Sequence, residues 1–245
     1  MIITREKFDA VLFDLDGVLT MTMKIHASCW KKMFDDYLQQ RAERLGQAFQ
    51  PFDVAADYKP YVDGRLRYDG VRAFLASRGI ALPEGTPADD SSLETVCGLG
   101  NRKDRMVQAA IATQGVEVLA GSLAMVHQVR AAGLKTAVVS ASKNCEAVLA
   151  AAGIRALFDV IVDGEVAERL GLPGKPAPDT FLEAARELGV AAPRAVVVED
   201  AISGVQAGRD GGFGLVVGID HHGDKTALQH NGADIVVADL TELLQ

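Results

Sequence analysis

Six short apolar runs recur along the chain, and each is nearly continuous rather than alternating with polar residues. They are AVLFD (10–14), KTAVVS (135–140), DVIV (159–162), AVVVED (195–200), GLVVGI (214–219) and DIVV (234–237). Runs of this kind are typical of parallel strands that are buried on both faces of a sheet. The pattern therefore predicts a parallel sheet.

Helical patterns rich in Ala, Leu, Glu and Arg separate most of these runs, and several close on a Gly at the expected C-terminal position. The segments are SLAMVHQVRAAG (122–133), CEAVLAAAG (145–153), DTFLEAARELG (179–189) and VQAGRDGG (205–212). Strands that alternate with helices indicate a doubly wound, Rossmann-like α/β sheet.

Residues 21–113 interrupt this alternation, because they contain helical patterns but no convincing strand. The helical patterns are HASCWKKMFDDYLQQRAERLG (26–46), GVRAFLASRG (70–79) and NRKDRMVQAAIATQG (101–115). The loop GIALPEGTPADDSS (79–92) is rich in Pro, Gly and Asp, so we expect an exposed connection there. We predict an α/β core formed by residues 1–20 and 114–245 and an all-helical insert formed by residues 21–113.

The composition of the 245 residues is ordinary for a globular protein, with 49% hydrophobic and 24% charged residues. The formal net charge of -8 argues against a nucleic-acid groove or an anionic membrane surface and favours a small-molecule ligand. The cysteines Cys29, Cys97 and Cys145 form no C-x-x-C pair, which fits structural thiols in a reducing cytoplasm. No apolar run approaches membrane-spanning length. We expect a cytoplasmic monomer that binds neither nucleic acid nor membranes.

Acidic residues stand where two of the predicted strands end. Asp14 and Asp16 close the first run, and Glu199 with Asp200 closes AVVVED. Because ligands bind at the carboxyl ends of the strands in open α/β sheets, we expect these four carboxylates to converge. Their mutual repulsion calls for a cation, and hard oxygen ligands suit Mg²⁺. A carboxylate beside Mg²⁺ can attack a phosphoryl group and form an aspartyl-phosphate.

Two further segments fit a phosphoryl ligand. Lys175, in GLPGKPAPDTF, supplies a point charge for phosphate, and Ser140 supplies a hydrogen bond at a strand end. Residues 141–144 open a helix whose free amides form an anion site. Taken alone, Lys175 resembles a surface lysine and Ser142 and Asn144 resemble helix caps, although capping and phosphate binding are compatible.

The motifs DLDGVL, VVSAS, GKPAPDTF and VVEDAISG occur in this order, and together they resemble the haloacid dehalogenase superfamily of phosphotransferases. Within it the chain is most similar to the β-phosphoglucomutase branch, which carries a helical cap domain after the first motif. The resemblance implies that Asp14 is the nucleophile and Asp16 the general acid and base. It also implies that Ser140 and Lys175 bind phosphate, and that Mg²⁺ is held by Asp14, Glu199, Asp200 and the backbone carbonyl of Asp16.

Finer similarities to this branch extend the site. In SASKN, the resemblance implies that Ser142, Lys143 and Asn144 hold a second, non-transferring phosphate. Thr22, His26 and Trp30 recur at the spacing of the branch, and His26 is then expected to steady Asp16, whereas packing is the favoured alternative for Trp30.

In the insert, the same resemblance suggests Arg72, within GVR, as the arginine for the distal phosphate. Arg102 and Lys103 are further candidates, although all three residues are by default solvated helix charges. His221 and His222 lie in a polar loop, and we expect them at the surface.

The function expected from this resemblance is interconversion of β-glucose 1-phosphate and glucose 6-phosphate, with Mg²⁺ as cofactor and glucose 1,6-bisphosphate as activating intermediate. A sugar-phosphate phosphatase, with water as acceptor, is the alternative. A catalytically silent binding protein on the same fold is a third reading, and the intact motif set counts against it.

Overall fold

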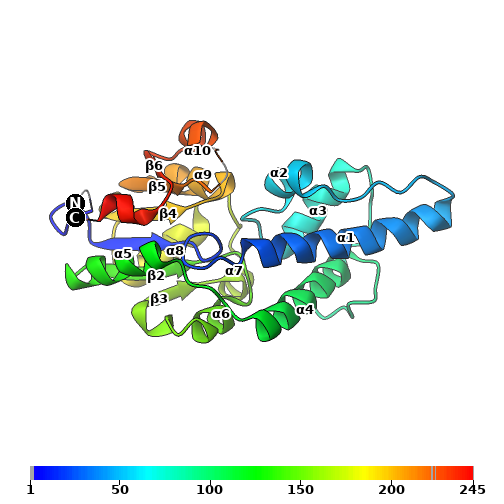
Figure 1. Ribbon diagram of the computed structural model, residues 1–245, viewed down its shortest axis with the longest axis horizontal. Coiled ribbons are helices and arrows are strands. Elements are labelled where there is room, and N and C mark those ends of the chain that lie inside the picture. Colours follow the sequence, from blue (N-terminus) through cyan, green and yellow to red (C-terminus); the bar gives the residue numbers. More distant parts are fainter. Residues whose placement is uncertain (1–2, 222, 224, 245) are drawn as a thin grey trace. The chain divides into compact units, whose positions relative to one another are not determined.

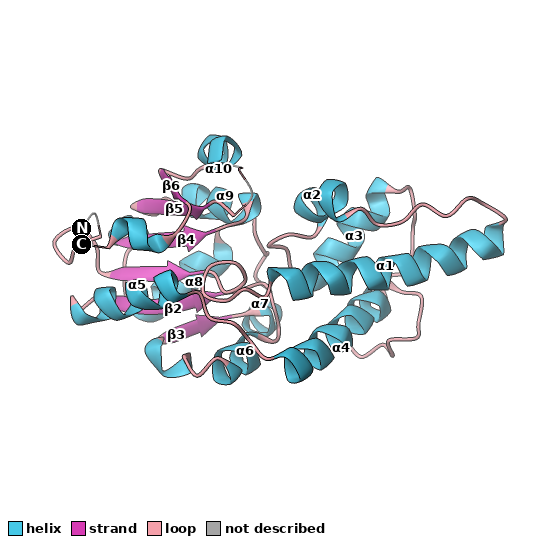
Figure 2. Cartoon of the chain, viewed as in Figure 1, coloured by secondary structure: helices cyan, strands magenta, loops and turns pink. Residues whose placement is uncertain are grey.

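The apolar runs form a single six-stranded sheet in the part of the chain that the computed structural model describes, which is residues 3–221, 223 and 225–244. The strand order is β3-β2-β1-β4-β5-β6, and every neighbouring pair is parallel (Figure 2). The strands are β1 (Ala10–Phe13), β2 (Lys135–Val139), β3 (Val160–Val162), β4 (Ala195–Glu199), β5 (Leu215–Ile219) and β6 (Ile235–Val237). The predicted α/β fold with a parallel sheet is confirmed.

The chain divides into two compact units. The sheet unit comprises the described residues of Met1–Thr22, Gly64–Leu66 and Val116–Gln245, and the helical unit comprises Met23–Asp63 and Arg67–Gly115. Figure 1 labels their elements in chain order.

The helices of the sheet unit are α5 (Ala120–Ala131), α6 (Cys145–Ala151), α7 (Gly164–Leu170), α8 (Asp179–Leu188), α9 (Ile202–Asp210) and α10 (Lys225–Asn231), with short 3₁₀ turns at Arg155–Leu157, Ala192–Arg194 and Leu240–Leu243. The helical unit contains α1 (Met23–Leu45), α2 (Lys59–Tyr61), α3 (Arg67–Ser77), α4 (Val96–Gln114) and a π-helical turn at Val54–Tyr58. The sequence patterns predicted α1, α3, α4, α5, α6, α8 and α9, but they did not predict α2, α7 and α10.

The sheet is buried on both faces at its centre, which explains why its strands are continuously apolar. Leu12 of β1 and Val139 of β2 share a cluster with Phe181 of α8. Phe13, which neighbours Leu12 and so points to the opposite face, packs edge-on against Phe158 with ring centroids 6.2 Å apart. All four residues of β1 are fully buried. Strand β1 is therefore the central element on which the site is built.

An aromatic cluster forms the core of the helical unit. The ring centroid of Phe34 lies 5.3 Å from that of Trp30, 5.3 Å from that of Phe52 and 4.1 Å from that of Phe74. These side chains come from α1, from α3 and from the segment between α1 and the π-helical turn. Burial of the Phe34 ring thus joins three parts of the unit.

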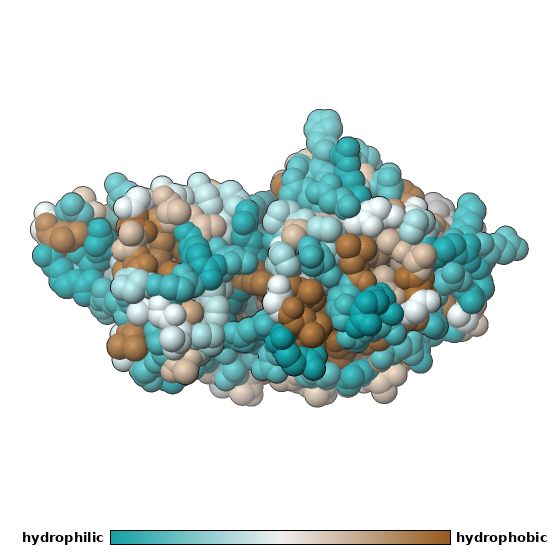
Figure 3. Space-filling view, turned by 180° about the vertical axis from the view of Figure 1, so that it is seen from behind, coloured by the Kyte–Doolittle hydropathy of each residue, from teal (hydrophilic) through white to brown (hydrophobic). Residues whose placement is uncertain are grey.

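The three cysteines are free thiols, and one face of the surface carries many hydrophilic residues (Figure 3). Cys29, Cys97 and Cys145 are free and buried, and burial raises the pKa of Cys29 and of Cys145, so both thiols are held in their neutral form. Hydrophilic residues interrupt the hydrophobic patches on the face drawn in Figure 3. Within the described residues, no helix has both the length and the apolar composition needed to cross a membrane.

We predict that Phe34→Ala lowers the free energy of unfolding of the helical unit by about 3–5 kcal/mol, because it removes a fully buried ring and leaves a cavity. Urea unfolding followed by fluorescence checks this, since the chain has a single tryptophan, Trp30, and it lies in the same cluster. The control is Phe49→Ala, whose ring is 42% exposed and whose loss should change stability by less than about 0.5 kcal/mol. Equal free energies of unfolding for the two variants would contradict the role given to the buried Phe34 ring.

Candidate active site

The register of the sheet places the polar strand ends side by side. Phe13 pairs with Val138 of β2 and with Val198 of β4, so the residues that follow lie at one edge. Asp14 continues this pattern, because its amide donates to the Val198 carbonyl at 2.9 Å. On the other side, the Ser140 amide donates to the Val162 carbonyl at 3.0 Å. The carboxyl edge of the sheet thus brings Asp14, Ser140 and Glu199 together.

The ammonium group of Lys175 lies among these strand ends. Its Nζ donates to Asp14 Oδ1 at 2.5 Å, to Glu199 Oε1 at 2.6 Å and to the Val139 carbonyl at 3.0 Å. Burial lowers the pKa of Lys175, but the charges of Asp14 and Glu199 outweigh it, so the pKa is raised and the lysine is charged. Lys175 is therefore not a surface lysine. Its peptide bond to Pro176 is cis.

Three carboxylates form a compact set of oxygen donors. Asp14, Glu199 and Asp200 each offer an oxygen within 4.8 Å of the other two. Glu199 is fixed by the amides of Asp200 and Ala201, which both donate to its Oε2 at 3.0 Å. Burial raises the pKa of Asp14, Lys175 opposes the change, and the charges of Glu199 and Asp16 add to it. A site whose own carboxylates disfavour the ionised Asp14 fits a hard divalent cation, which would stabilise that charge.

Asp16 follows in a tight loop. The loop turns at Gly17, whose φ of +87° favours glycine. The hydroxyl of Thr22 donates to Asp16 Oδ1, and Thr20 contacts the same hydroxyl at 2.8 Å. The Asp16 carboxyl group, which is partly exposed, is therefore oriented by the chain that leaves the sheet.

The expectation that His221 is a plain surface residue is wrong. Its Nε2 donates to the Gly17 carbonyl at 2.6 Å, and the side chain is partly buried. His221 follows β5 and so reaches the same edge of the sheet. No signal in the sequence links residues 17 and 221, since they come together only through the strand order. His222 lies outside the described residues.

The segment SASKN forms a series of turns after β2. Ser140 Oγ accepts the Ser142 amide at 3.1 Å, and Ser142 Oγ accepts the Asn144 amide at 3.1 Å. Asn144 occupies the N-cap position of α6, but its side chain makes no capping hydrogen bond there, so the alternative of a plain helix cap is not supported for Asn144. The Lys143 ammonium group forms an ion pair with Glu168 of α7. Ser142 and Lys143 are both partly exposed.

In the helical unit, His26, Trp30 and Lys103 lie together. Lys103 Nζ donates to His26 Nδ1 at 2.9 Å and lies 4.8 Å from the centroid of the Trp30 ring. All three side chains are buried. Trp30 belongs to the aromatic cluster, which agrees with the favoured packing role. Contact of His26 with Asp16 stays a prediction.

The arginine candidates of the helical unit all have partners. Arg72 is exposed and forms ion pairs with Asp69 and with Glu84. Arg102 Nε donates to the Ser91 carbonyl at 2.8 Å. Their roles toward phosphate stay predictions.

Arg67 is a further arginine at the start of the helical segment that follows Leu66, and the sequence motifs did not single it out. It forms an ion pair with Asp104 at 2.8 Å, and its side chain is mostly buried. It follows Leu66 in the chain, and Leu66 packs so tightly on Gly174 that a Cβ at Gly174 would lie 2.5 Å from Leu66 Cγ. Gly174 precedes Lys175, and consecutive Cα atoms are about 3.8 Å apart. Chain connectivity therefore ties Arg67 to a residue packed beside the lysine loop.

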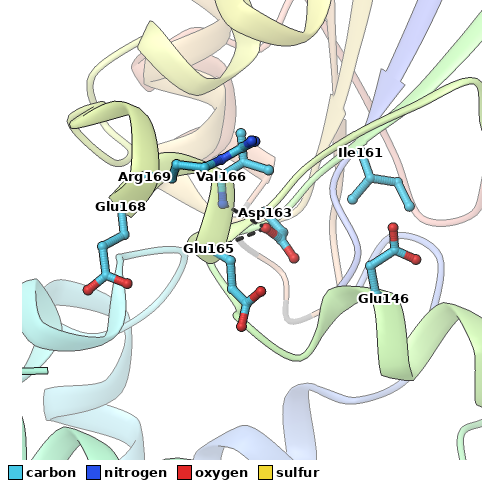
Figure 4. Close-up of a pocket in the computed structure, with 7 residues that line it drawn as sticks. All are labelled: Glu146, Ile161, Asp163, Glu165, Val166, Glu168 and Arg169. Atoms are coloured by element: carbon cyan, nitrogen blue, oxygen red, sulfur yellow. Dashed lines mark hydrogen bonds between the residues drawn. The ribbon is translucent and has the colours of Figure 1, made fainter. Parts of the chain in front are cut away.

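A cavity of about 420 Å³ opens beside α7 (Figure 4). Its lining residues are Glu146, Ile161, Asp163, Glu165, Val166, Glu168 and Arg169. This set contains none of the site residues expected from the sequence. The candidate active site is therefore the strand-end cluster and not this cavity.

We predict that Lys175→Met lowers the free energy of unfolding by about 3–5 kcal/mol without added metal, because two buried carboxylates lose their cation. Added Mg²⁺ should restore part of this loss. Chemical denaturation with and without Mg²⁺ checks the prediction, with Lys225→Met, at an exposed position of α10, as the control. A Lys175→Met protein as stable as the control in both conditions would contradict the role given to the ammonium group.

Comparisons with known proteins agree with the motifs and the fold. The family model of haloacid dehalogenase-like hydrolases matches residues 8–212. Two proteins named β-phosphoglucomutase, from Mycobacterium bovis and Mycobacterium tuberculosis, are each 52% identical to the chain over 242 residues, which cover 98% of this chain and 92% of theirs. The crystal structure of a β-phosphoglucomutase from Clostridium difficile is similar with a TM-score of 0.76 at 25% identity, covering 96% of this chain and 93% of that one. The chain belongs to the haloacid dehalogenase-like hydrolase family.

Proposed function

We propose that the chain is a β-phosphoglucomutase, which interconverts β-glucose 1-phosphate and glucose 6-phosphate through glucose 1,6-bisphosphate. The observation that carries the phosphoryl chemistry is the buried Lys175 ammonium group, which contacts Asp14 and Glu199 beside Asp200. The 52% identity to two proteins of that name, over nearly the whole chain, supports the mutase reaction and the glucose substrate.

In this proposal Asp14 is the nucleophile. An oxygen of its carboxylate forms a bond to phosphorus while the bond from phosphorus to the sugar oxygen breaks, and the product is an aspartyl-phosphate. Asp16 donates a proton to the departing sugar oxygen, and in the second half-reaction it takes a proton from the accepting hydroxyl group. Lys175 and Ser140 hold oxygens of the transferring group.

The donor set supports Mg²⁺ as the cofactor. Asp14, Glu199, Asp200 and the backbone carbonyl of Asp16 would hold the ion. When bound, Mg²⁺ offsets negative charge on the transferring phosphoryl group. Lys175 adds a second positive charge from within the protein.

The second phosphate of the bisphosphate requires a separate anion site. We assign Ser142, Lys143 and Asn144 to it in the sheet unit. From the helical unit, which we assign as the cap domain, Arg72 is the arginine expected from the sequence, and Arg67 is a further candidate because of its link to Leu66. Closure of such a cap would exclude water, which otherwise hydrolyses the aspartyl-phosphate. Thr22, His26, Trp30, Arg102 and Lys103 remain substrate-site candidates, and the monomeric state and cytoplasmic location stay predictions.

The direct test of this function is an assay with β-glucose 1-phosphate, Mg²⁺ and a trace of glucose 1,6-bisphosphate, in which glucose 6-phosphate and free phosphate are measured together. A mutase makes glucose 6-phosphate faster than it releases phosphate, and it depends on the bisphosphate. Faster release of phosphate would replace this proposal by a sugar-phosphate phosphatase. Absence of turnover would point to a silent binding protein.

We predict that Asp16→Asn slows isomerisation by about 10²- to 10⁴-fold, which is the usual contribution of general acid–base catalysis. Phosphoryl transfer from acetyl phosphate to the enzyme should fall far less, because its leaving group is a carboxylate that needs no proton. Steady-state and single-turnover rates on protein with a native circular dichroism spectrum check this. An equal loss with both phosphoryl donors would mean that Asp16 does not act by moving a proton.

We predict that Lys143→Ala weakens isomerisation by about ten- to a hundredfold in kcat/KM, through the loss of a charge-assisted hydrogen bond to the distal phosphate. Hydrolysis of acetyl phosphate, which has no second phosphate, serves as the matched reaction and should change little. Parallel losses in both reactions would exclude a specific role of Lys143 at the second phosphate.

A further inference from the structure

The Lys143 ammonium group is held by a carboxylate from a different element of the sheet unit. Glu168 Oε2 lies in ion-pair contact with Lys143 Nζ, and the two residues are 25 positions apart. The Lys143 side chain is 19% exposed and that of Glu168 is 43% exposed. Lys143 is thus largely sheltered, whereas its carboxylate partner remains open to solvent.

The backbone fixes the place of Glu168. The amide of Gly164, the first residue of α7, donates to the Ser142 carbonyl at 3.2 Å. A Cβ at Gly164 would lie 2.8 Å from the Ala141 carbonyl oxygen and 3.0 Å from Lys143 Cγ, so only glycine allows this close packing. Glu168 follows Gly164 by four residues and lies on the same face of the helix. The packing of Gly164 against the SASKN turns therefore places Glu168 close to Lys143.

Hydrogen bonds at the N-terminus of α7 and a glycine at its C-terminus fix where this helix begins and ends. Asp163 Oδ1 accepts the amides of Glu165 and Val166 at 3.0 Å each. The helix ends at Gly171 in the left-handed conformation with φ of +65°. Both ends of this short helix are thus defined by local interactions, and the position of Glu168 does not depend on an extended loop.

We propose that Glu168 is a specificity-determining residue that competes with the distal phosphate for Lys143. This inference rests on the proposed function, in which Lys143 binds that phosphate. A phosphate carries nearly two negative charges and three acceptor oxygens, so it displaces a single exposed carboxylate, whereas a weaker anion does so less well. Every anion that engages Lys143 must displace Glu168, so a weak anion gains too little from this contact, whereas a phosphate still binds, which is specificity gained through a competing contact.

The chain offers a matched control on the same helix. Glu165 and Glu168 both line the cavity beside α7, and Figure 4 shows their carboxylates directed to separate places. Glu165→Gln removes the same charge from the same helix as Glu168→Gln. The two variants therefore separate the contact with Lys143 from a general change in the acidic lining.

The experiment measures binding of glucose 1,6-bisphosphate in the presence of Mg²⁺ by isothermal titration calorimetry, with Asp14→Asn in every protein so that no phosphoryl transfer occurs. Glu168→Gln should tighten binding by about two- to fivefold, the range expected when a partly exposed ion pair no longer competes. Glu165→Gln should leave the affinity unchanged. In otherwise wild-type enzyme, Glu168→Gln should lower the KM for β-glucose 1-phosphate with little change in kcat.

Binding of the bisphosphate to Lys143→Ala distinguishes failure of this inference from failure of the proposed function. In a Lys143→Ala background the effect of Glu168→Gln should vanish, because the two substitutions act through one contact. If Lys143→Ala weakens binding but Glu168→Gln does not tighten it, or if Glu165→Gln tightens it equally, this inference is overturned and the proposed function stands. If Lys143→Ala itself leaves binding unchanged, the second phosphate site of the proposed function is wrong, and the inference falls with it.

Discussion

The buried ammonium group of Lys175 is the interaction on which the arrangement of the site depends. It contacts the carboxylate that follows β1, the carboxylate that ends β4 and the carbonyl of the last residue of β2. Two buried carboxylates this close would repel each other, and their desolvation is costly unless a cation is shared between them. The lysine therefore holds together the ends of three neighbouring strands.

The same cluster explains how a stable sheet carries reactive groups. Strands β1 and β4 are apolar and buried up to Phe13 and Val198. Their only polar groups there are those of the backbone, which form the ladder of hydrogen bonds between neighbouring strands. Polar residues begin where the ladder ends, and there burial and the neighbouring carboxylates raise the pKa of Asp14. One lysine charge compensates only part of the acidic charge of Asp14, Glu199 and Asp200. The remaining excess is the physical reason for assigning a divalent cation to this edge.

The fold was largely predictable because its signals are local. Continuous apolar runs between helical patterns are sufficient to indicate parallel strands, and parallel strands bring their carboxyl ends to one edge. The meeting of Asp14, Glu199 and Asp200 follows from that rule. Helix α7 was not predicted, although Asp163 and Gly171 mark its two ends in the sequence.

Contacts between distant segments were not predictable. The hydrogen bond from His221 to Gly17 and the ion pair between Lys143 and Glu168 depend on the order of strands and on the packing of α7, which leave no periodic signal in the sequence. Arg72 was expected from a local motif, and Arg67 was not considered because it lies outside that motif. The packing of Leu66, the residue before Arg67, on Gly174 joins segments more than a hundred residues apart.

In the proposed reaction Asp14 accepts the phosphoryl group. The most direct measurement is brief incubation with glucose 1,6-bisphosphate and Mg²⁺, followed by borohydride reduction, which converts an aspartyl-phosphate to homoserine, and peptide mass spectrometry. We expect homoserine at position 14 in the wild-type protein and none in Asp14→Asn. Homoserine at another aspartate, or a phosphorylated residue that is not aspartate, would contradict it.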